Sequence, residues 1–259
     1  MNITLDTVMS ALITVLTLLF ALLPHEIAHG YTAYLMGDRT AKQMGRLSFN
    51  PFRHINTMNA GWILLGLFVG QLFDNPAMAN LSRILMFVGF VMLLQPVPIN
   101  PANFRDPKKG MAITALMGPV MNLVIAFLSL ILCYLSAIGM RWGEMQGNET
   151  LSQILHYAVV FFRMLTHYSI ALAVFNLIPI PPLDGSRVLF AFLPSRYYFK
   201  VMQYERYIMV IFLVLLYAGA FDLLLGTGEQ NVFSVFDNLC HTIVDPLSKS
   251  VLGYRIIIQ

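Results

Sequence analysis

The sequence predicts an all-α polytopic membrane protein with about six transmembrane helices. Of its 259 residues, 58% are hydrophobic and only 11% are charged, whereas soluble domains carry roughly 25% charged residues. Several apolar runs approach or exceed the ~20 residues that a helix needs to cross a bilayer. These observations favour one bundle of membrane helices and leave no room for a sizeable soluble domain.

The first predicted helix covers residues 7–36. About 30 residues of helix measure roughly 45 Å, which exceeds the ~30 Å hydrocarbon core. We therefore expect this helix to tilt, or to break near Pro24. Residues 38–59 are polar and basic, and the partial alternation within 42–50 predicts a short membrane-associated β-hairpin after the first helix.

Five further helices are predicted, separated by turn signals and proline-rich loops. We assign residues 1–225 to one transmembrane domain and residues 226–259 to a C-terminal tail that lies along the membrane interface. The further helices are expected at residues 58–73, 78–94, 110–140, 154–180 and 207–225.

The positive charges predict the orientation of the bundle. Six spans place the loops 38–57, 95–109 and 181–206 on one side, and these loops hold 11 of the 16 lysines and arginines. Loops rich in these residues face the cytoplasm, so both termini are expected outside. The basic residues concerned are Arg39, Lys42, Arg46, Arg53, Arg105, Lys108, Lys109, Arg187, Arg196, Lys200 and Arg206.

An HExxH motif, His25-Glu26-Ile27-Ala28-His29, lies toward the cytoplasmic end of the first helix. Residues 25 and 29 are one helical turn apart, so both imidazoles leave the same face. Two such nitrogens can bind one Zn²⁺, and the adjacent glutamate can act as general base on a water held by the metal. The apolar setting suggests hydrolysis within a membrane.

Catalytic zinc usually has three protein ligands, and Asp184 is the best candidate for the third. It follows the helix predicted at 154–180, at the same cytoplasmic depth as the HExxH. Carboxylates at membrane depth are rare and functional by default. The prolines before Asp184 break the helix, which is tolerated there only where backbone lines a cavity or packs within protein.

These motifs resemble those of the site-2 proteases, intramembrane zinc metalloproteases of peptidase family M50. The family pattern combines HExxH with NxxPxxxLDG in a later span, and this sequence matches the second motif in full. The resemblance extends from about residue 12 to 206 and indicates a compact form without a PDZ or CBS domain. The matching residues are Asn176, Pro179, Leu183, Asp184 and Gly185, with Gly118-Pro119-Val120-Met121-Asn122, Asn50-Pro51, His54 and residues 96–100 as further similar elements.

The resemblance implies one Zn²⁺ per chain, bound by His25, His29 and Asp184, with Glu26 as the catalytic base. It also implies that Asn122 and Asn176 lie near the bound substrate. Asn122 is additionally a candidate catalytic residue, because a neutral amide can donate to the oxyanion without adding charge.

Substrate binding is expected to involve the hairpin. A transmembrane substrate must be unwound before its amides can be attacked, and an edge strand at 42–50, including Gly45 and Leu47, could hold the extended segment. His54 is most simply an interfacial loop histidine, with an accessory role near the metal as the alternative.

The expected function is regulated intramembrane proteolysis in a bacterial cell membrane, with the active site toward the cytoplasm. Expected partners are a single-pass membrane protein or signal-peptide substrate, the lipid bilayer and a membrane-protein regulator. Nucleic acid is not expected, because no basic face is interleaved with aromatic residues. A metal or ion transporter is one alternative, disfavoured because no internal repeat is found. A non-catalytic binder is the other, disfavoured because all four site residues are present.

Overall fold

The structure, a computed structural model, describes residues 5–54, 96–194, 203–217 and 222–254, together with positions 61, 65 and 69. Every regular element in this part of the chain is helical, which confirms the predicted all-α class. The α-helices are α1 (Leu5–Leu35), α2 (Thr40–Gln43), α5 (Pro107–Met145), α6 (Glu149–Asn176), α7 (Asp184–Ala191), α9 (Glu205–Tyr217) and α10 (Asp222–Leu252), and two short 3₁₀ helices cover Pro51–Arg53 and Pro101–Asn103.

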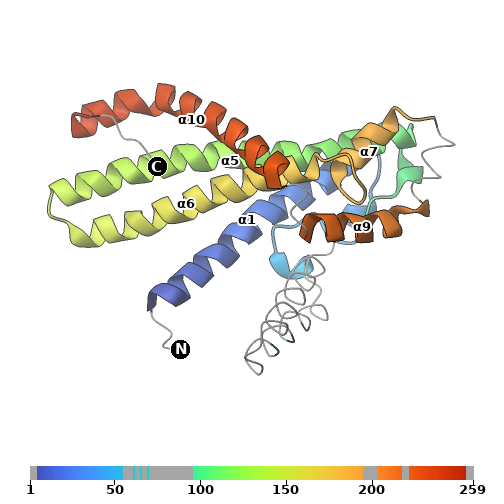
Figure 1. The fold of residues 1–259 in the computed structure, drawn as a ribbon, viewed down its shortest axis with the longest axis horizontal. Coiled ribbons are helices and arrows are strands. Elements are labelled where there is room, and N and C mark those ends of the chain that lie inside the picture. Colours follow the sequence, from blue (N-terminus) through green and yellow to red (C-terminus); the bar gives the residue numbers. More distant parts are fainter. Residues whose placement is uncertain are drawn as a thin grey trace.

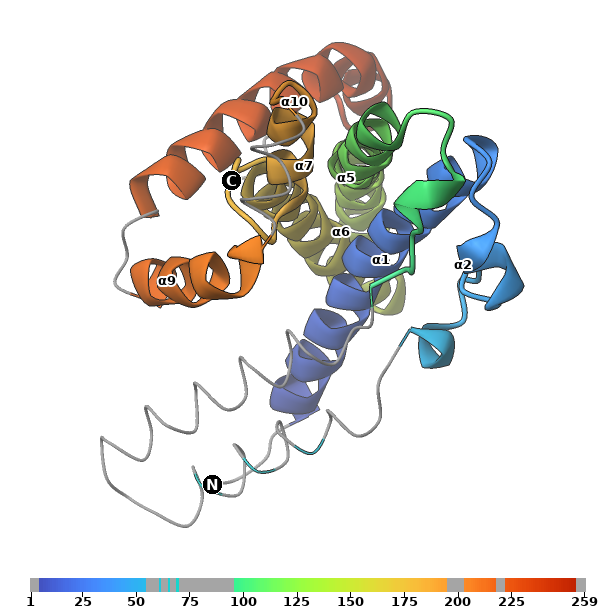
Figure 2. The same ribbon diagram turned by 90° about the vertical axis from the view of Figure 1, so that its right-hand side faces the viewer.

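Helices α5 and α6 form a long antiparallel hairpin at the centre of the fold (Figure 1). The turn between them contains Gly147 at φ +68°, and Asn148 caps α6 by accepting a hydrogen bond from the Leu151 N–H. Helices α1 and α10 pack against this hairpin from different sides (Figure 2). Helix α7 packs on α5 near the end of the hairpin that lies away from the turn.

Three described helical segments are long and apolar enough to cross a membrane, namely Leu12–Leu35, Pro107–Met145 and Glu149–Asn176. On α5, exposed apolar side chains recur every fourth residue and so form one continuous stripe. Such a stripe would be costly in water and suits contact with lipid. Its members are Leu116, Val120, Val124, Leu128 and Leu132.

The helices predicted at 7–36, 110–140 and 154–180 are present as α1, α5 and α6. Pro24 lies inside α1 without ending it. The range 207–225, predicted as one helix, is divided between α9 and α10. The ranges 58–73 and 78–94 lie outside the described residues apart from positions 61, 65 and 69, so six spans stay a prediction.

The β-hairpin predicted at 42–50 is wrong for the described residues. Thr40–Gln43 form the single turn α2, and Gly45 at φ +66° ends it. The Gly45 N–H bonds to the Lys42 carbonyl and the Arg46 N–H to the Ala41 carbonyl at 2.9 Å. This pair of bonds is a Schellman helix end, which turns the chain before any strand can begin.

The predicted C-terminal tail forms most of α10. Cys240, Val244 and Leu252 of this helix pack with Leu130 and Tyr134 of α5 in a buried cluster. The boundary predicted at residue 226 therefore falls inside a helix that is joined to the bundle. An interfacial position for residues 226–259 stays a prediction.

Candidate metal centre

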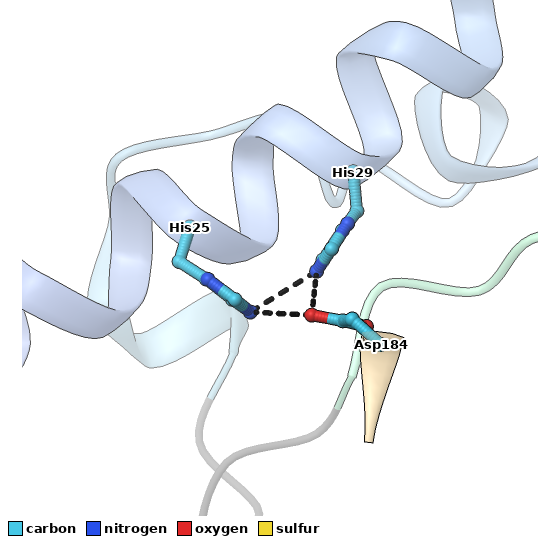
Figure 3. Close-up of side chains that lie close together, drawn as sticks. All are labelled: His25, His29 and Asp184. Carbon is cyan, nitrogen blue, oxygen red and sulfur yellow. Dashed lines mark hydrogen bonds and ion pairs between the residues drawn. The ribbon is translucent and has the colours of Figure 1, made fainter. Parts of the chain in front are cut away.

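His25 and His29 lie one turn apart on α1 and point to the same side (Figure 3). Both are buried, with exposed fractions of 5% and 7%. Their Nε2 atoms are 3.0 Å apart, and the rings are nearly perpendicular, at 86°. The HExxH spacing thus produces two converging nitrogens, as predicted.

Asp184 approaches these nitrogens from α7, of which it is the first residue. Its Oδ2 lies 3.3 Å from His25 Nε2 and 3.1 Å from His29 Nε2. The following Gly185 is required for this approach, because a Cβ there would stand 2.7 Å from the Ile178 carbonyl oxygen and closer still to that of Leu177. The Leu-Asp-Gly sequence therefore folds the chain tightly enough to bring the carboxylate to α1.

The three donor atoms have the spacing of a zinc site. Zinc–ligand bonds of 2.0–2.1 Å in tetrahedral geometry separate the donor atoms by about 3.3–3.4 Å, close to the three distances found. His29 Nδ1–H donates to the Thr114 carbonyl at 2.7 Å, so the Nε2 lone pair is free to bind metal. Asp184 Oδ2 is buried and accepts no hydrogen bond from the described residues, so the donor set fits a Zn²⁺ ion.

The charge state of Asp184 also suits a metal ligand. Burial acts to raise the pKa of this carboxyl, but the adjacent His25 and His29 side chains act more strongly in the opposite direction. The pKa of Asp184 is therefore held below its ordinary value. The group is a carboxylate at neutral pH, which is the form that binds metal.

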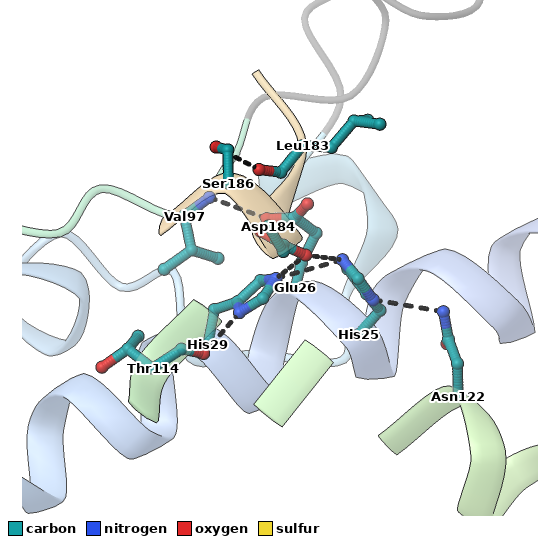
Figure 4. A network of polar contacts seen from close by, with 9 residues as sticks. All are labelled: His25, Glu26, His29, Val97, Thr114, Asn122, Leu183, Asp184 and Ser186. Atoms are coloured by element: carbon teal, nitrogen blue, oxygen red, sulfur yellow. Dashed lines mark hydrogen bonds and ion pairs between the residues drawn. The ribbon is translucent and has the colours of Figure 1, made fainter. Parts of the chain in front are cut away.

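One face of α5 forms the wall behind both histidines (Figure 4). Thr114, Gly118 and Asn122 follow one another at intervals of four residues on this face. A Cβ at Gly118 would stand 2.6 Å from His25 Cε1 and closer still to His29, so only glycine lets the rings approach. The Asn122 amide contacts His25 Nδ1 at 3.1 Å.

Glu26 lies at the edge of a cavity of about 550 Å³ next to the three donor atoms. Its Oε2 accepts a hydrogen bond from the Val97 N–H at 2.9 Å (Figure 4). Apolar side chains make up most of the cavity wall, and a few polar groups converge at one side of it, which is typical of a ligand-binding site. The lining includes Leu22, Val97, Ile99, Met111, Leu172 and Phe175.

The remaining predicted site residues lie at different distances from this cavity. Asn176, at the end of α6, lines it. Asn122 is fully buried behind His25 and is not among the lining residues. Gly45 and Leu47 do not line it either; the Gly45 carbonyl accepts a hydrogen bond from Arg53.

His54 is also away from the cavity. It is fully buried, and its Nε2–H donates to the Ser48 carbonyl at 2.8 Å. This bond ties the segment that follows α2 to the short 3₁₀ helix Pro51–Arg53. The histidine therefore stabilises a loop in the structure, and an accessory role near the metal stays a prediction.

Three groups near the site were not singled out from the sequence. Two are backbone groups, the Val97 N–H and the Thr114 carbonyl, and no side-chain motif marks such groups. The third is Asp38, which is fully buried and holds the loop containing Val97. An aspartate directly after a helix-ending glycine is the one signal that could have identified it.

Comparison with known proteins agrees with this geometry. The model of the family described as "Peptidase family M50" matches residues 13–218. The chain belongs to this family. A protein of Bacillus subtilis (strain 168), named "Putative zinc metalloprotease YwhC", is 30% identical over 226 residues, which cover 86% of this chain and 90% of that protein. No solved structure matches the chain.

As a member of peptidase family M50, the site-2 protease family, the chain is an intramembrane zinc metallopeptidase. The apolar α1, α5 and α6 agree with an integral membrane protein. Its substrates are membrane-tethered proteins in the bilayer. The transporter and the non-catalytic binder are not favoured.

Proposed function

We propose that this chain hydrolyses peptide bonds within or near the transmembrane segments of its substrates, using one Zn²⁺ per chain bound by His25, His29 and Asp184. The observation that carries the proposal is the convergence of His25 Nε2, His29 Nε2 and Asp184 Oδ2 at 3.0–3.3 Å. Glu26 follows His25 directly and borders the same cavity.

In this proposal Glu26 is the general base. When bound, zinc would supply a water ligand of lowered pKa, about 7, and would polarise the scissile carbonyl. Glu26 takes the proton from the attacking water and returns it to the leaving amine. Most of the cavity wall is apolar, and surroundings of low polarity strengthen the electrostatic interactions inside.

Asn122 is proposed to position His25 rather than to touch the substrate. A histidine that ligates through Nε2 carries its proton on Nδ1 and donates it to an outer partner. The Asn122 side chain lies at that nitrogen, and its carbonyl oxygen can accept this proton when the amide is oriented accordingly. Asn176, which lines the cavity, is the candidate for substrate contact.

The proposed substrates are a single-pass membrane protein or a leftover signal peptide, and a membrane-protein regulator is a further proposed partner. We place the active site toward the cytoplasm of a bacterial cell, because most lysines and arginines lie in loops on that side. Arg187, one turn after Asp184, lines the cavity and belongs to these loops.

The test is the Glu26→Gln variant, assayed with a model transmembrane substrate in proteoliposomes. We expect zinc content equal to that of the wild type and a loss of cleavage by about 10²–10⁴-fold. Cleavage at the wild-type rate would overturn the role of Glu26. A wild type that cleaves nothing but carries zinc across the vesicle membrane would indicate a transporter.

A further inference from the structure

The Glu26 carboxylate is held by a single backbone donor among the described residues. The Val97 N–H donates to Oε2 at 2.9 Å. A carboxylate has two oxygens, so this bond orients the group through Oε2 and leaves Oε1 to take a proton. The direction of Glu26 therefore depends on where the Val97 N–H points.

The direction of the Val97 N–H is restricted by its neighbours. Pro96 and Pro98 flank it, and proline fixes its own φ near −65° while it confines the preceding residue to extended conformations. Val97 is itself buried, with 5% exposed. Its Cγ1 lies so close to Gly30 of α1 that a Cβ on that glycine would stand only 2.6 Å away. The backbone of this segment is therefore rigid, and its position depends on the contacts that hold it to the rest of the protein.

The anchor of this segment is Asp38. Its Oδ2 accepts from the Asn100 N–H at 2.7 Å, and its Oδ1 accepts from Asn103 Nδ2 at 2.7 Å. The N–H and Oγ1–H of Thr40 also donate to Oδ1, at 3.0 and 2.5 Å. With four donors on two oxygens, the buried Asp38 side chain has little freedom to rotate.

Asp38 is in turn attached to α1, the helix that carries Glu26. Its N–H donates to the Ala33 carbonyl at 2.9 Å, and Gly37 before it takes φ +110° to make the turn. The segment 96–100 is therefore fastened to α1 at two points. Both fastenings are bonds from a backbone N–H of the segment to a carboxylate, that of Glu26 at one end and that of Asp38 at the other.

We propose that Val97 and Asp38 are positioning residues for the catalytic base. Asp38 fixes the segment 96–103 against the end of α1, and the Val97 N–H then aims the Glu26 carboxylate. This inference rests on the proposed function, in which Glu26 is the base. It adds that the full activity of the base requires a loop distant in sequence to hold it in place.

The first experiment removes the Val97 N–H. Val97→Pro deletes the donor within a sequence already flanked by prolines, and Val97→Ala, which keeps the N–H, is the matched control. With the model substrate we expect kcat of Val97→Pro to fall about 100-fold, the cost of a misplaced catalytic group. KM and bound zinc of Val97→Pro should stay unchanged, and Val97→Ala, which loses side-chain packing but keeps the N–H, should retain a kcat well above that of Val97→Pro.

An ester in place of the peptide bond between residues 96 and 97 removes the same N–H without a new ring, and should lower kcat in the same way. Equal kcat values for the proline and alanine variants, or full kcat in the ester, would overturn the proposal. Loss of zinc from the ester variant would also overturn it, because the segment would then support the metal ligands instead of Glu26.

The second experiment tests the anchor. Asp38→Asn replaces one carboxylate oxygen by an NH₂ group, which cannot accept the hydrogen bonds that Asp38 receives. The segment should then be held less firmly, so we expect lower kcat with zinc retained. Asp106→Asn is the control, because Asp106 caps α5 and has no bond to the segment 96–100. Equal activity of the two variants would overturn the role of Asp38. Glu26→Gln tests the base itself, so that failure of the proposed function is distinguished from failure of this inference.

Discussion

Gly118 is the position at which one added methyl group should disable the metal centre. In the Gly118→Ala variant the new Cβ would stand 2.6 Å from His25 Cε1, whereas ordinary contacts begin at 3.4 Å. To reach an ordinary contact, the His25 ring must therefore retreat by 3.4 − 2.6 = 0.8 Å, and the His29 ring by more. Because Pro119 and the α5 backbone cannot yield easily, the rings move and the donor atoms separate.

The magnitude follows from this displacement. Misplacement by about 1 Å costs up to about 100-fold in catalysis, and disturbed outer support of a metal ligand costs about 10–100-fold in metal affinity. Overpacking should destabilise the fold by about 1–3 kcal/mol. We therefore expect Gly118→Ala to bind zinc at least 10-fold more weakly and to lose nearly all cleavage.

The assay is zinc competition with a chromophoric chelator, together with thermal unfolding and cleavage of the model substrate. Gly139→Ala, on the same helix, is the matched control: its Cβ would meet only the flexible end of Leu155, at 2.9 Å. Its zinc affinity should equal that of the wild type, and the better helix propensity of alanine offsets part of any strain. Wild-type zinc affinity in Gly118→Ala would refute the packing argument.

Three further outcomes are expected. Asp184→Asn should reduce zinc affinity by more than the ~10–100-fold that outer partners contribute, measured by chelator competition; unchanged affinity would remove Asp184 from the site. Tyr134→Phe deletes a hydroxyl that donates to Asp237 at 2.5 Å and contacts His241 at 2.9 Å. Unfolding should become easier by about 1–3 kcal/mol with zinc affinity retained, and equal melting temperatures would contradict this.

Burial acts to raise the pKa of Asp38, but hydrogen bonds from its partners outweigh it and lower the pKa below 3.8. The stability that Asp38 contributes is therefore present above that pH and is lost as pH falls through the lowered value. As pH falls below 3.8, the melting temperature should therefore fall more steeply in the wild type than in Asp38→Asn. Equal slopes for the two proteins would contradict this contribution of Asp38.

The sequence was sufficient where the physical signal is long or strongly constrained. Apolar length identified α1, α5 and α6. The spacing of HExxH and the depth of Asp184 predicted that His25, His29 and Asp184 would meet, and their donor atoms do converge. In each case many residues, or a fixed helical geometry, determine the result.

The sequence was insufficient where a single local interaction determines the structure. The alternation over 42–50 predicted strands, yet the left-handed Gly45 closes a helix end there. Asn122 was expected beside the substrate, but a motif on α5 does not reveal whether its amide faces the cavity or the far edge of the His25 ring. The Val97 N–H could not be found at all, because every non-proline residue carries the same group.

Metal binding by Asp184 should also affect the stability of the fold. His29 and Asp184 are separated by 184 − 29 = 155 residues, and an ion bound by both closes that length of chain into a loop. In the chain-entropy treatment of cross-links, a loop of this size corresponds to about 5 kcal/mol at 25 °C. The bound zinc would thus also cross-link α1 to the end of the α5–α6 hairpin. The stability of the helix bundle, as well as catalysis, would then depend on the available zinc.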